Sequence, residues 1–269
     1  MENKGWSKTE IKTAEELPKN SWALGYFHSF HYNWDGKTWI RNFYELMKRD
    51  LLLFTLGDLK GKKILEIGCG DGVYLDIIAR QGGVIFGQDI SSEYAAVATK
   101  KLKENFFDVD IKVGSATKLL FSDNYFDGVI AADFLEHVTY EEKKKIVAEV
   151  YRVLKPGGIF AIKTPNLSYL KISLLLRKMA AIIRFRSPFC IEIPHTNKNP
   201  DNQHCGLTTY DELEGILLNN MFHFPVITYF PLYGKRIPKF IARFLYGKKK
   251  FCEQIIIATR KPLFLGFYP

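Results

Sequence analysis

Residues 64–74 constrain the fold of this chain more than any other stretch. They read Ile-Leu-Glu-Ile-Gly-Cys-Gly-Asp-Gly-Val-Tyr. The apolar start is typical of a buried parallel strand, and glycines follow at positions 68, 70 and 72 before an apolar-faced helix opens near Leu75. Such a turn lets backbone amides and a helix N-terminus approach a nucleotide-like ligand. A dinucleotide-binding loop would have glycine at the sixth place, where this chain has Val73.

Composition places the chain among soluble globular proteins. It has 269 residues, of which 47% are hydrophobic and 25% charged. We find no signal-peptide pattern and no apolar run of the roughly 18 residues that a membrane span needs, so we expect a cytoplasmic protein. Cys69, Cys190, Cys205 and Cys252 show no CxxC spacing. This suits a reducing compartment and argues against a zinc site, so the sequence predicts no metal.

Charge is unevenly distributed along the chain. Residues 1–166 contain 23 basic and 23 acidic side chains, whereas residues 167–269 contain 15 basic and 6 acidic ones. The whole formal net charge of +9 therefore falls in the last 103 residues. A basic half indicates nucleic acid, an anionic membrane or an acidic substrate as partner, or simply a solvated face.

Apolar segments of strand and helix type alternate through the middle of the chain. We expect strands at 64–67, 84–90, 110–113, 126–132 and 159–163, with helices between them, then a sixth strand at 226–229 and a seventh at 254–260. This rhythm predicts a parallel sheet with helices on both faces and ligands at the carboxyl ends of its strands. Asp89 ends the second strand about 20 residues after the first glycine. There a carboxylate can accept both hydroxyls of a ribose; the alternative is that it caps the next helix.

Several motifs in this order carry a family resemblance. They are Glu66–Gly72, Asp89, "FSDNYFD" at 121–127, "LEHV" at 135–138, "LKPGG" at 154–158 and "TPN" at 164–166. Together, over about 105 residues, they resemble class I S-adenosylmethionine-dependent methyltransferases. The resemblance implies an α/β, Rossmann-like, seven-stranded and mostly parallel sheet with an antiparallel last strand, and S-adenosylmethionine as cofactor.

The resemblance also implies the residues that would bind the cofactor. Asp89 would hold the ribose hydroxyls, Ser115 and Ala116 would flank the adenine, and Asp133 would lie near the methionine part. The family often has aspartate where this chain has Ser115. The full predicted set is Glu66, Gly68, Cys69, Gly70, Gly72, Asp89, Ile90, Ser115, Ala116, Asp133 and Phe134.

Methyl transfer from a sulfonium asks little of side chains beyond positioning, which can supply ~7–11 kcal/mol of the barrier. For an oxygen acceptor a base can take up the hydroxyl proton, and we take His137, His195 and His204 as candidate catalytic residues because imidazole titrates near neutral pH. The alternative for His137 is a packing role at a helix start.

The acceptor side is expected outside the motif region. Aromatic residues crowd positions 22–39, a helical stripe runs from Tyr169 to Ile183, and a loop-like segment spans 188–204. We predict Tyr32, Trp34, Asn166 and Tyr169 as substrate-binding residues. The segment "HCGLTTYDELEGILLNNMF" at 204–222 resembles a methyltransferase branch often associated with saccharide and cell-envelope biosynthesis, which usually has glycine where this chain has Met221.

The predicted organisation has four parts. They are an N-terminal helical lid at 1–57, an adenosylmethionine-binding core at 58–166, an acceptor-side helical and loop insertion after the fifth strand at 167–206, and completion of the sheet at 207–269. A basic amphipathic segment at 235–250 predicts either a helix lying on the anionic inner face of a membrane or one packed on the domain.

The favoured function is O-methylation of a small-molecule, saccharide or lipid-linked acceptor, such as a glycan or a quinone-like ring. One alternative is a binding module that keeps the cofactor fold without turnover. The other is a nucleic-acid methyltransferase. No Asn/Asp-Pro-Pro-aromatic motif that would hold a flipped base follows the fourth predicted strand, so a nucleic-acid partner is not favoured.

Overall fold

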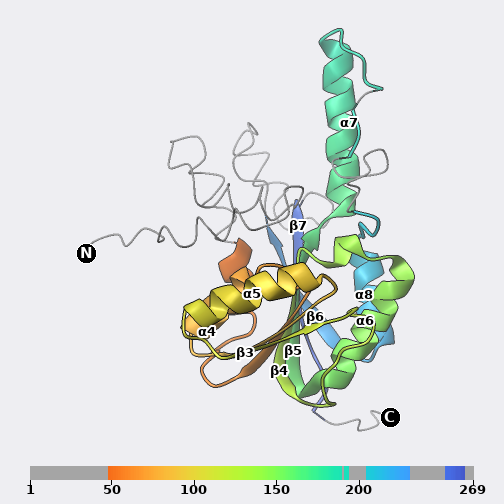
Figure 1. The fold of residues 1–269 in the computed structure, drawn as a ribbon. Helices are drawn as coiled ribbons and strands as arrows, with labels where there is room; N and C mark the ends of the chain where they lie inside the picture. Colours follow the sequence, from red (N-terminus) through yellow and green to blue (C-terminus); the bar gives the residue numbers. More distant parts are fainter. Residues whose placement is uncertain (1–47, 190, 194–203, 231–251, 264–269) are drawn as a thin grey trace, which may run out of the picture. The chain divides into compact units, whose positions relative to one another are not determined.

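The computed structural model describes residues 48–189, 191–193, 204–230 and 252–263 (Figure 1). The chain divides into two compact units, residues 1–120 and 121–269. Most of the predicted lid at 1–57 and all of the basic segment at 235–250 lie outside the described residues. The predicted boundaries at 57, 166 and 206 stay predictions.

The first unit holds three parallel strands. They are β1 (Lys63–Ile67), β2 (Val84–Asp89) and β3 (Val109–Val113), in the order β3-β2-β1. In the pairing register Glu66 lies opposite Gly87, and Asp89 lies opposite Val113. The apolar residues of β1 are buried, as expected for a strand of a parallel sheet that is covered on both faces.

Two helices of the first unit pack on these strands (Figure 1). α4 (Val73–Arg80) buries Leu75 and Ile78, and α5 (Ser92–Glu104) buries Ala98 and Leu102. Residues 48–54 also form a helix.

The second unit holds the remaining described strands. β4 (Phe126–Ala132) and β5 (Leu154–Pro165) are parallel, whereas β7 (Gln254–Arg260) runs antiparallel to both β5 and β6 (His223–Phe230). Their order is β4-β5-β7-β6. The α/β, Rossmann-like and mostly parallel arrangement with an antiparallel last strand is therefore confirmed.

The fifth strand is longer than the sequence predicts. We expected it at 159–163, after a Lys-Pro-Gly-Gly break, but β5 already begins at Leu154. Leu154 pairs with Phe126, and the register then shifts so that Ile159 pairs with Gly128. The break therefore ends the preceding helix and leaves an irregularity inside the strand, because Gly157, with φ of 79°, tolerates the bend.

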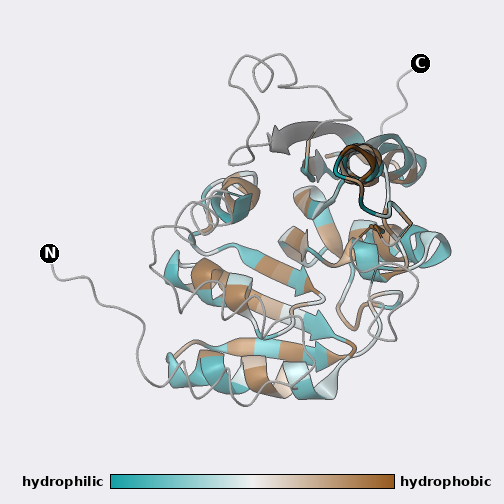
Figure 2. Ribbon diagram, turned by 90° about the horizontal axis from the view of Figure 1, so that it is seen from above, coloured by the Kyte–Doolittle hydropathy of each residue, from teal (hydrophilic) through white to brown (hydrophobic). Residues whose placement is uncertain are grey.

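Helices of the second unit flank its strands. A short 3₁₀ helix, η1 (Leu135–His137), follows β4, and α6 (Tyr140–Val153) and α8 (Tyr210–Asn219) contact each other. α7 (Leu167–Ile183) projects from the strands (Figure 1), and Figure 2 looks along its axis. Several of its apolar side chains are exposed, among them Leu176, Met179 and Ile183. The predicted stripe of apolar residues in this helix is thus only partly covered by the described part of the chain.

Among the described residues, no helix has both the length and the apolar character needed to cross a membrane.

Candidate functional site

The glycine turn at 68–72 joins β1 to α4. Gly68, Gly70 and Gly72 have φ of 66°, 50° and 75°, in the left-handed region that glycine enters without strain. The amide of Gly68 donates to the carbonyl of Gln88 at 2.8 Å, which ties the turn to the end of β2. Because Gly72 has no side chain to cap α4, the start of this helix is open to a ligand or to a neighbouring acid.

Glu66 is the acid beside this helix start. It is only 3% exposed, its carboxyl accepts a hydrogen bond from the amide of Leu75, and its Oε2 has no hydrogen-bond partner among the described residues. Burial, and next the charges of Asp71 and Asp89, raise the pKa of Glu66 well above its usual value. A buried carboxyl oxygen without a partner is a natural acceptor for a donor group of a bound molecule.

Asp89 ends β2 and is oriented by two backbone amides. Its Oδ2 accepts from Gly70 N and its Oδ1 accepts from Ser91 N, both at 2.9 Å. Ser91, not Asp89, caps α5, since its hydroxyl accepts from Tyr94 N. A carboxylate offers about four acceptor positions, so two remain for hydroxyl donors.

Gln88 organises the loop that follows β3. Its amide nitrogen donates to the carbonyls of Ser115 and Lys118 at 2.9 and 3.1 Å, and its Oε1 accepts from Leu120 N at 3.0 Å. The predicted adenine residues Ser115 and Ala116 therefore lie in a loop that a buried side chain fixes in shape. Ile90, also predicted to bind cofactor, is 76% exposed directly after Asp89.

Asp133 ends β4 in the second unit and pairs with a buried lysine. Its φ is 50°, unusual for a residue other than glycine. Lys163, fully buried in β5, meets the Asp133 carboxylate at 2.5 Å, and the Asp133 amide donates to the Lys163 carbonyl at 2.8 Å. The ion pair and this backbone bond together hold Asp133 in a strained conformation, which is typical of a functional position.

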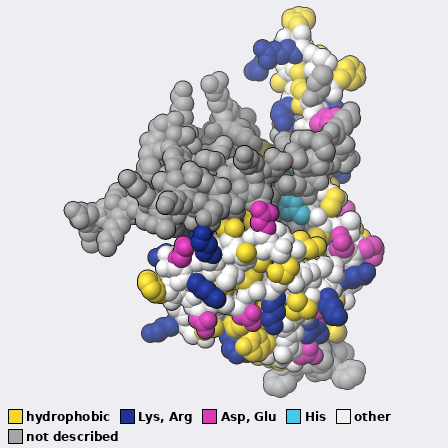
Figure 3. Space-filling view, viewed as in Figure 1, with side chains coloured by type: hydrophobic (Ala, Val, Ile, Leu, Met, Phe, Trp, Pro, Cys, Tyr) yellow, Lys and Arg dark blue, Asp and Glu magenta, His cyan; other side chains and the backbone are white. Residues whose placement is uncertain are grey.

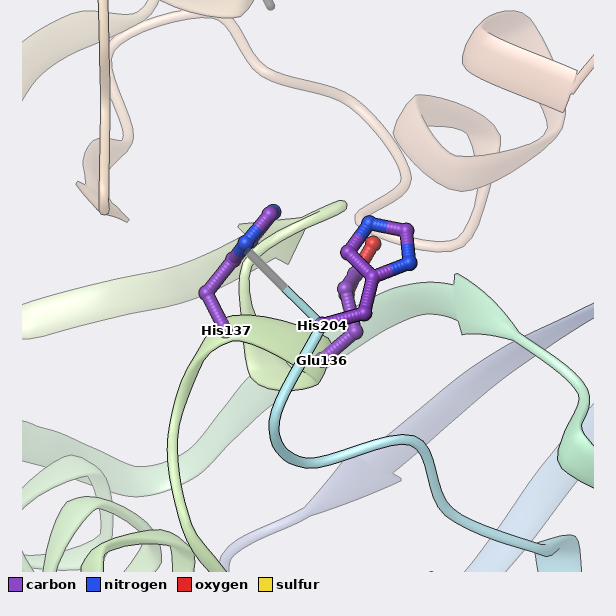
Figure 4. Close-up of side chains that lie close together, drawn as sticks. All are labelled: Glu136, His137 and His204. Atoms are coloured by element: carbon purple, nitrogen blue, oxygen red, sulfur yellow. The ribbon is translucent and has the colours of Figure 1, made fainter. Parts of the chain in front are cut away.

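Glu136, His137 and His204 form what we call the His-Glu-His cluster (Figure 4). The potential ligand atoms of the three side chains lie within 4.8 Å of one another, and the two imidazole centroids are 5.0 Å apart. Glu136 is 2% exposed and accepts from Thr164 Oγ1 at 3.0 Å. Burial, and next the charge of Asp133, raise the pKa of Glu136 to about 8.

In Figure 3 a histidine side chain, drawn in cyan, is visible on the surface below α7. Both imidazoles of the cluster are partly exposed. The structure therefore brings two of the three predicted catalytic histidines together at a place that solvent can reach. The third, His195, lies outside the described residues, as do the predicted substrate residues Tyr32 and Trp34.

Asn166 and Tyr169 are the predicted substrate residues that are described. Asn166 is fully buried. Its side-chain Oδ1 accepts a hydrogen bond from Ser168 N at the start of α7, and its side-chain Nδ2 donates one to the carbonyl of Cys252. These contacts serve the fold, and a substrate-binding role for Asn166 stays a prediction. Tyr169 is also buried in α7, and its role likewise stays a prediction.

Two residues of the site were missed by our sequence reasoning. Gln88 carries no motif signal, since a buried glutamine that shapes a loop is visible only in three dimensions. Glu136 stood inside the quoted "LEHV" motif, next to His137. Its position beside a candidate base was the available signal, but the approach of His204 from elsewhere in the chain could not be read from spacing.

Known proteins match part of this chain. Residues 65–162 match the family described as "Methyltransferase domain". A probable S-adenosylmethionine-dependent methyltransferase of Mycolicibacterium smegmatis is 33% identical over 106 residues, 39% of this chain and 39% of that protein. A ubiquinone biosynthesis O-methyltransferase of Thiobacillus denitrificans is 32% identical over 138 residues, 51% of this chain and 59% of that protein. The match thus spans about half the length of these curated relatives.

A solved structure extends the similarity of fold over most of the chain. The S-adenosylmethionine-dependent methyltransferase of Archaeoglobus fulgidus superposes with a TM-score of 0.58 at 19% identity, covering 90% of this chain and all of that one. This likeness concerns the fold, and the family match concerns the segment that holds the glycine turn, Asp89 and the His137 motif. The chain therefore contains a class I S-adenosylmethionine-dependent methyltransferase domain.

Proposed function

We propose that this chain is an S-adenosylmethionine-dependent methyltransferase that methylates an oxygen atom of a small-molecule, saccharide or lipid-linked acceptor. The observation that carries the proposal is the pair of acids at the glycine turn. Asp89 is held by two amides with acceptor positions to spare, and Glu66 keeps a buried oxygen without a partner among the described residues.

The charge of this region suits the cofactor. S-adenosylmethionine bears a sulfonium, an ammonium and two ribose hydroxyls, which are all cationic or donor groups. Asp89 would accept the ribose hydroxyls, and the glycine turn would let the cofactor approach the backbone as closely as Gly68 and Gly70 allow. Glu66 would complete the polar cradle, because a cationic ligand nearby favours its ionised form.

Other predicted residues would bind the adenine and methionine ends. Ile90 offers exposed apolar surface directly after Asp89, which suits the face of an adenine ring. Ser115 and Ala116 would meet its edge from the loop that Gln88 shapes. Asp133 and Phe134 would serve the methionine part, and Cys69 and Gly72 belong to the turn itself. One continuous seven-stranded sheet across the two units is part of the same proposal, supported by the similarity of fold over 90% of the chain.

The bound cofactor supplies an already activated methyl group, so the protein's own residues need to orient the acceptor and handle one proton. His137 and His204 are the candidate bases that lie together, and both are partly exposed. Oxygen as the methylated atom is supported by the relatives named ubiquinone biosynthesis O-methyltransferases. A saccharide or lipid-linked acceptor rests on the resemblance of the 204–222 segment and on the basic charge after residue 166.

A two-part experiment tests this function. Calorimetry with S-adenosylmethionine and the full chain should show binding, and absence of binding would contradict the proposal. Incubation with methyl-labelled cofactor and a fractionated native extract should then place the label in lipid, saccharide or small-molecule fractions. Label in nucleic acid or protein alone would favour a different acceptor class, and binding without any label transfer would favour the non-catalytic module.

A further inference from the structure

The His-Glu-His cluster has a donor set that the proposed base role does not use. It joins two imidazoles and one carboxylate, with the potential ligand atoms within 4.8 Å of one another. All three side chains point to the same side, from η1 and from the segment that contains His204 (Figure 4). A single general base needs one imidazole and a group that orients it, so three converging ligands call for another explanation.

The backbone around the cluster is built to bring its two halves together. His204 is 67 positions after His137, yet the 204–206 segment is held against η1 by several hydrogen bonds. Gly206 N donates to Glu136 O at 2.9 Å, Cys205 Sγ donates to His137 O at 3.2 Å, and the buried Lys143 donates to Gly206 O. The approach of His204 to η1 is therefore a fixed feature of the fold.

Gly206 is what permits this approach. A Cβ at this position would lie 1.7 Å from the carbonyl oxygen of Val138, so no other residue fits without moving the backbone. On its other side the segment continues to Thr208, whose carbonyl accepts from Leu167 N at 3.1 Å. Thr209 then opens α8 with a capping box formed with Glu212. The segment is thus held at Gly206 and at the start of α8.

The two buried lysines near Glu136 each contact another group. Of the two buried lysines near it, Lys163 pairs with Asp133, and Lys143 is directed at the carbonyl of Gly206. Thr164 donates to one carboxyl oxygen of Glu136 and so fixes its orientation. A hydrogen bond of this kind to a carboxylate is typical of metal ligands, which are held in place by their neighbours.

We propose that the His-Glu-His cluster binds a divalent transition-metal ion, with Zn²⁺ as its closest chemical match. Two histidines and one carboxylate suit Zn²⁺, Mn²⁺ or Fe²⁺, whereas Mg²⁺ and Ca²⁺ prefer oxygen ligands alone. Zinc ligands at about 2.0–2.1 Å from the metal lie about 3.4 Å apart in a tetrahedral site. The potential ligand atoms, now within 4.8 Å of one another, would have to move closer together when the ion binds.

Three protein ligands leave at least one coordination position open, which distinguishes a catalytic site from a structural one. If the proposed function holds, an acceptor hydroxyl bound at that position becomes more acidic. Its proton leaves to water, the oxygen forms the new bond to the methyl group, and the S–CH₃ bond breaks to release S-adenosylhomocysteine. In this proposal the two imidazoles hold the metal, which replaces the base role considered for them above.

The cluster uses no cysteine, which is why cysteine spacing could not reveal it. Cys205 is nevertheless a neighbour whose thiol could compete for the metal, although its Sγ is engaged with His137 O. A test must therefore separate the thiol from the imidazoles.

The decisive measurement is calorimetric titration of Zn²⁺ into the tag-free, chelator-treated full chain, with bound metal confirmed by mass spectrometry. We expect one Zn²⁺ per chain and at least a ~10-fold weaker affinity in His137→Ala, His204→Ala and Glu136→Gln. His223→Ala, a histidine outside the cluster, and Cys205→Ser should bind as the unmodified chain does. Absence of Zn²⁺ binding, or equal binding by His204→Ala, would overturn the proposal, and loss of binding in Cys205→Ser would replace the proposed ligand set.

Cofactor binding provides the readout that separates this inference from the proposed function. His204→Ala should keep its affinity for S-adenosylmethionine while losing Zn²⁺, and Asp89→Ala should do the reverse. A chain that binds Zn²⁺ but no cofactor would support the metal site and refute the proposed function. A chain that binds cofactor but no Zn²⁺ would refute only the metal site.

Discussion

The glycine turn and the His-Glu-His cluster place functional groups in opposite ways. The turn is contiguous, and its polar contacts come from residues within about two dozen positions, mostly through backbone amides. The cluster gathers side chains from positions 136, 137 and 204 through a close backbone approach at Gly206. A backbone-built site can be read from a motif, whereas a side-chain site that joins distant segments depends on the packing that unites them.

The two regions also differ in their use of buried charge. At the glycine turn, Glu66 keeps an oxygen without a partner among the described residues, and its pKa is raised first by burial. In the second unit, Asp133 is matched by Lys163, and Glu136 accepts from Thr164. The first arrangement suits a ligand that brings its own positive charge, and the second suits side chains that must stay in one place.

The largest effect is expected at Gly206. Gly206→Ala should lower the free energy of unfolding by about 3 kcal/mol, because the new methyl group would collide with the Val138 carbonyl. Zn²⁺ affinity should fall with it, since the collision displaces His204 from η1. Chemical denaturation and calorimetry measure the two effects.

Gly215→Ala is the matched control for this change. Gly215 lies in α8, and an added Cβ there meets nothing within 4 Å. The variant should gain about 0.5–1 kcal/mol from helix propensity and bind Zn²⁺ unchanged. If the two variants had the same stability, the role assigned to Gly206 would be wrong.

The pH dependence of the unfolding free energy tests the buried carboxyl of Glu66 at the glycine turn. The pKa of Glu66 is raised in the folded protein, so between the unfolded value near 4.5 and the higher folded value the folded state holds a proton that the unfolded state has lost. Stability therefore falls as pH rises through this range, by up to about 1.4 kcal/mol per pH unit. Glu66→Gln should remove this slope, so the difference between its denaturation free energy and that of the unmodified chain should grow from pH 5 to pH 7. A constant difference would contradict the burial of an uncompensated carboxyl.

Asp89→Ala tests the cofactor side directly. Loss of the hydrogen bonds to a charged acceptor should weaken S-adenosylmethionine binding by roughly 10- to 100-fold, as measured by calorimetry. Asp110→Ala, which removes an exposed aspartate in β3, is the control and should bind normally. Equal affinities in the two variants would remove Asp89 from the proposed ribose site.

The sequence predicted the core of the fold because its elements are locally encoded. The strands β1, β2, β4 and β7 each carry a short, mainly apolar run, and Thr139 with Glu142 forms the capping box that starts α6. The start of β5 was wrong because proline and glycine signal a break, while pairing with β4 extends the strand through it.

The candidate site was only partly predictable for a related reason. Gly68, Gly70 and Asp89 belong to a motif with a fixed spacing, and in the structure the amide of Gly70 donates a hydrogen bond to Asp89. Gln88 and Glu136 act through partners more than 25 positions away, so no local pattern indicates them. Contacts that the backbone makes within a local motif can therefore be predicted from the sequence, whereas side-chain contacts between distant residues cannot.

A smaller effect on stability distinguishes backbone strain from a steric contact at two glycines of the first unit. Gly72→Ala should cost about 1–2 kcal/mol, because φ of 75° is strained for alanine and the new Cβ would lie 3.1 Å from Ala98 Cβ. Gly61→Ala has a similar φ of 70° but meets nothing within 4 Å, so it should cost only the strain, about 1 kcal/mol. Chemical denaturation gives the difference, and only Gly72→Ala should weaken cofactor binding.

The smallest expected effect concerns the two capping boxes of the second unit. Thr139→Ala and Thr209→Ala each remove an N-cap hydroxyl that accepts a hydrogen bond at 3.3 Å, so each should cost about 1 kcal/mol of unfolding free energy. Their effects on Zn²⁺ should differ, however. Thr209 closes the segment that carries His204, whereas Thr139 starts α6 directly after η1, so fraying α8 should loosen one metal ligand and fraying α6 should loosen the whole of η1. We therefore expect Thr139→Ala to weaken Zn²⁺ binding more than Thr209→Ala, although the two variants are equally stable. The reverse order would mean that the position of the 204–206 segment, and not that of η1, limits Zn²⁺ affinity.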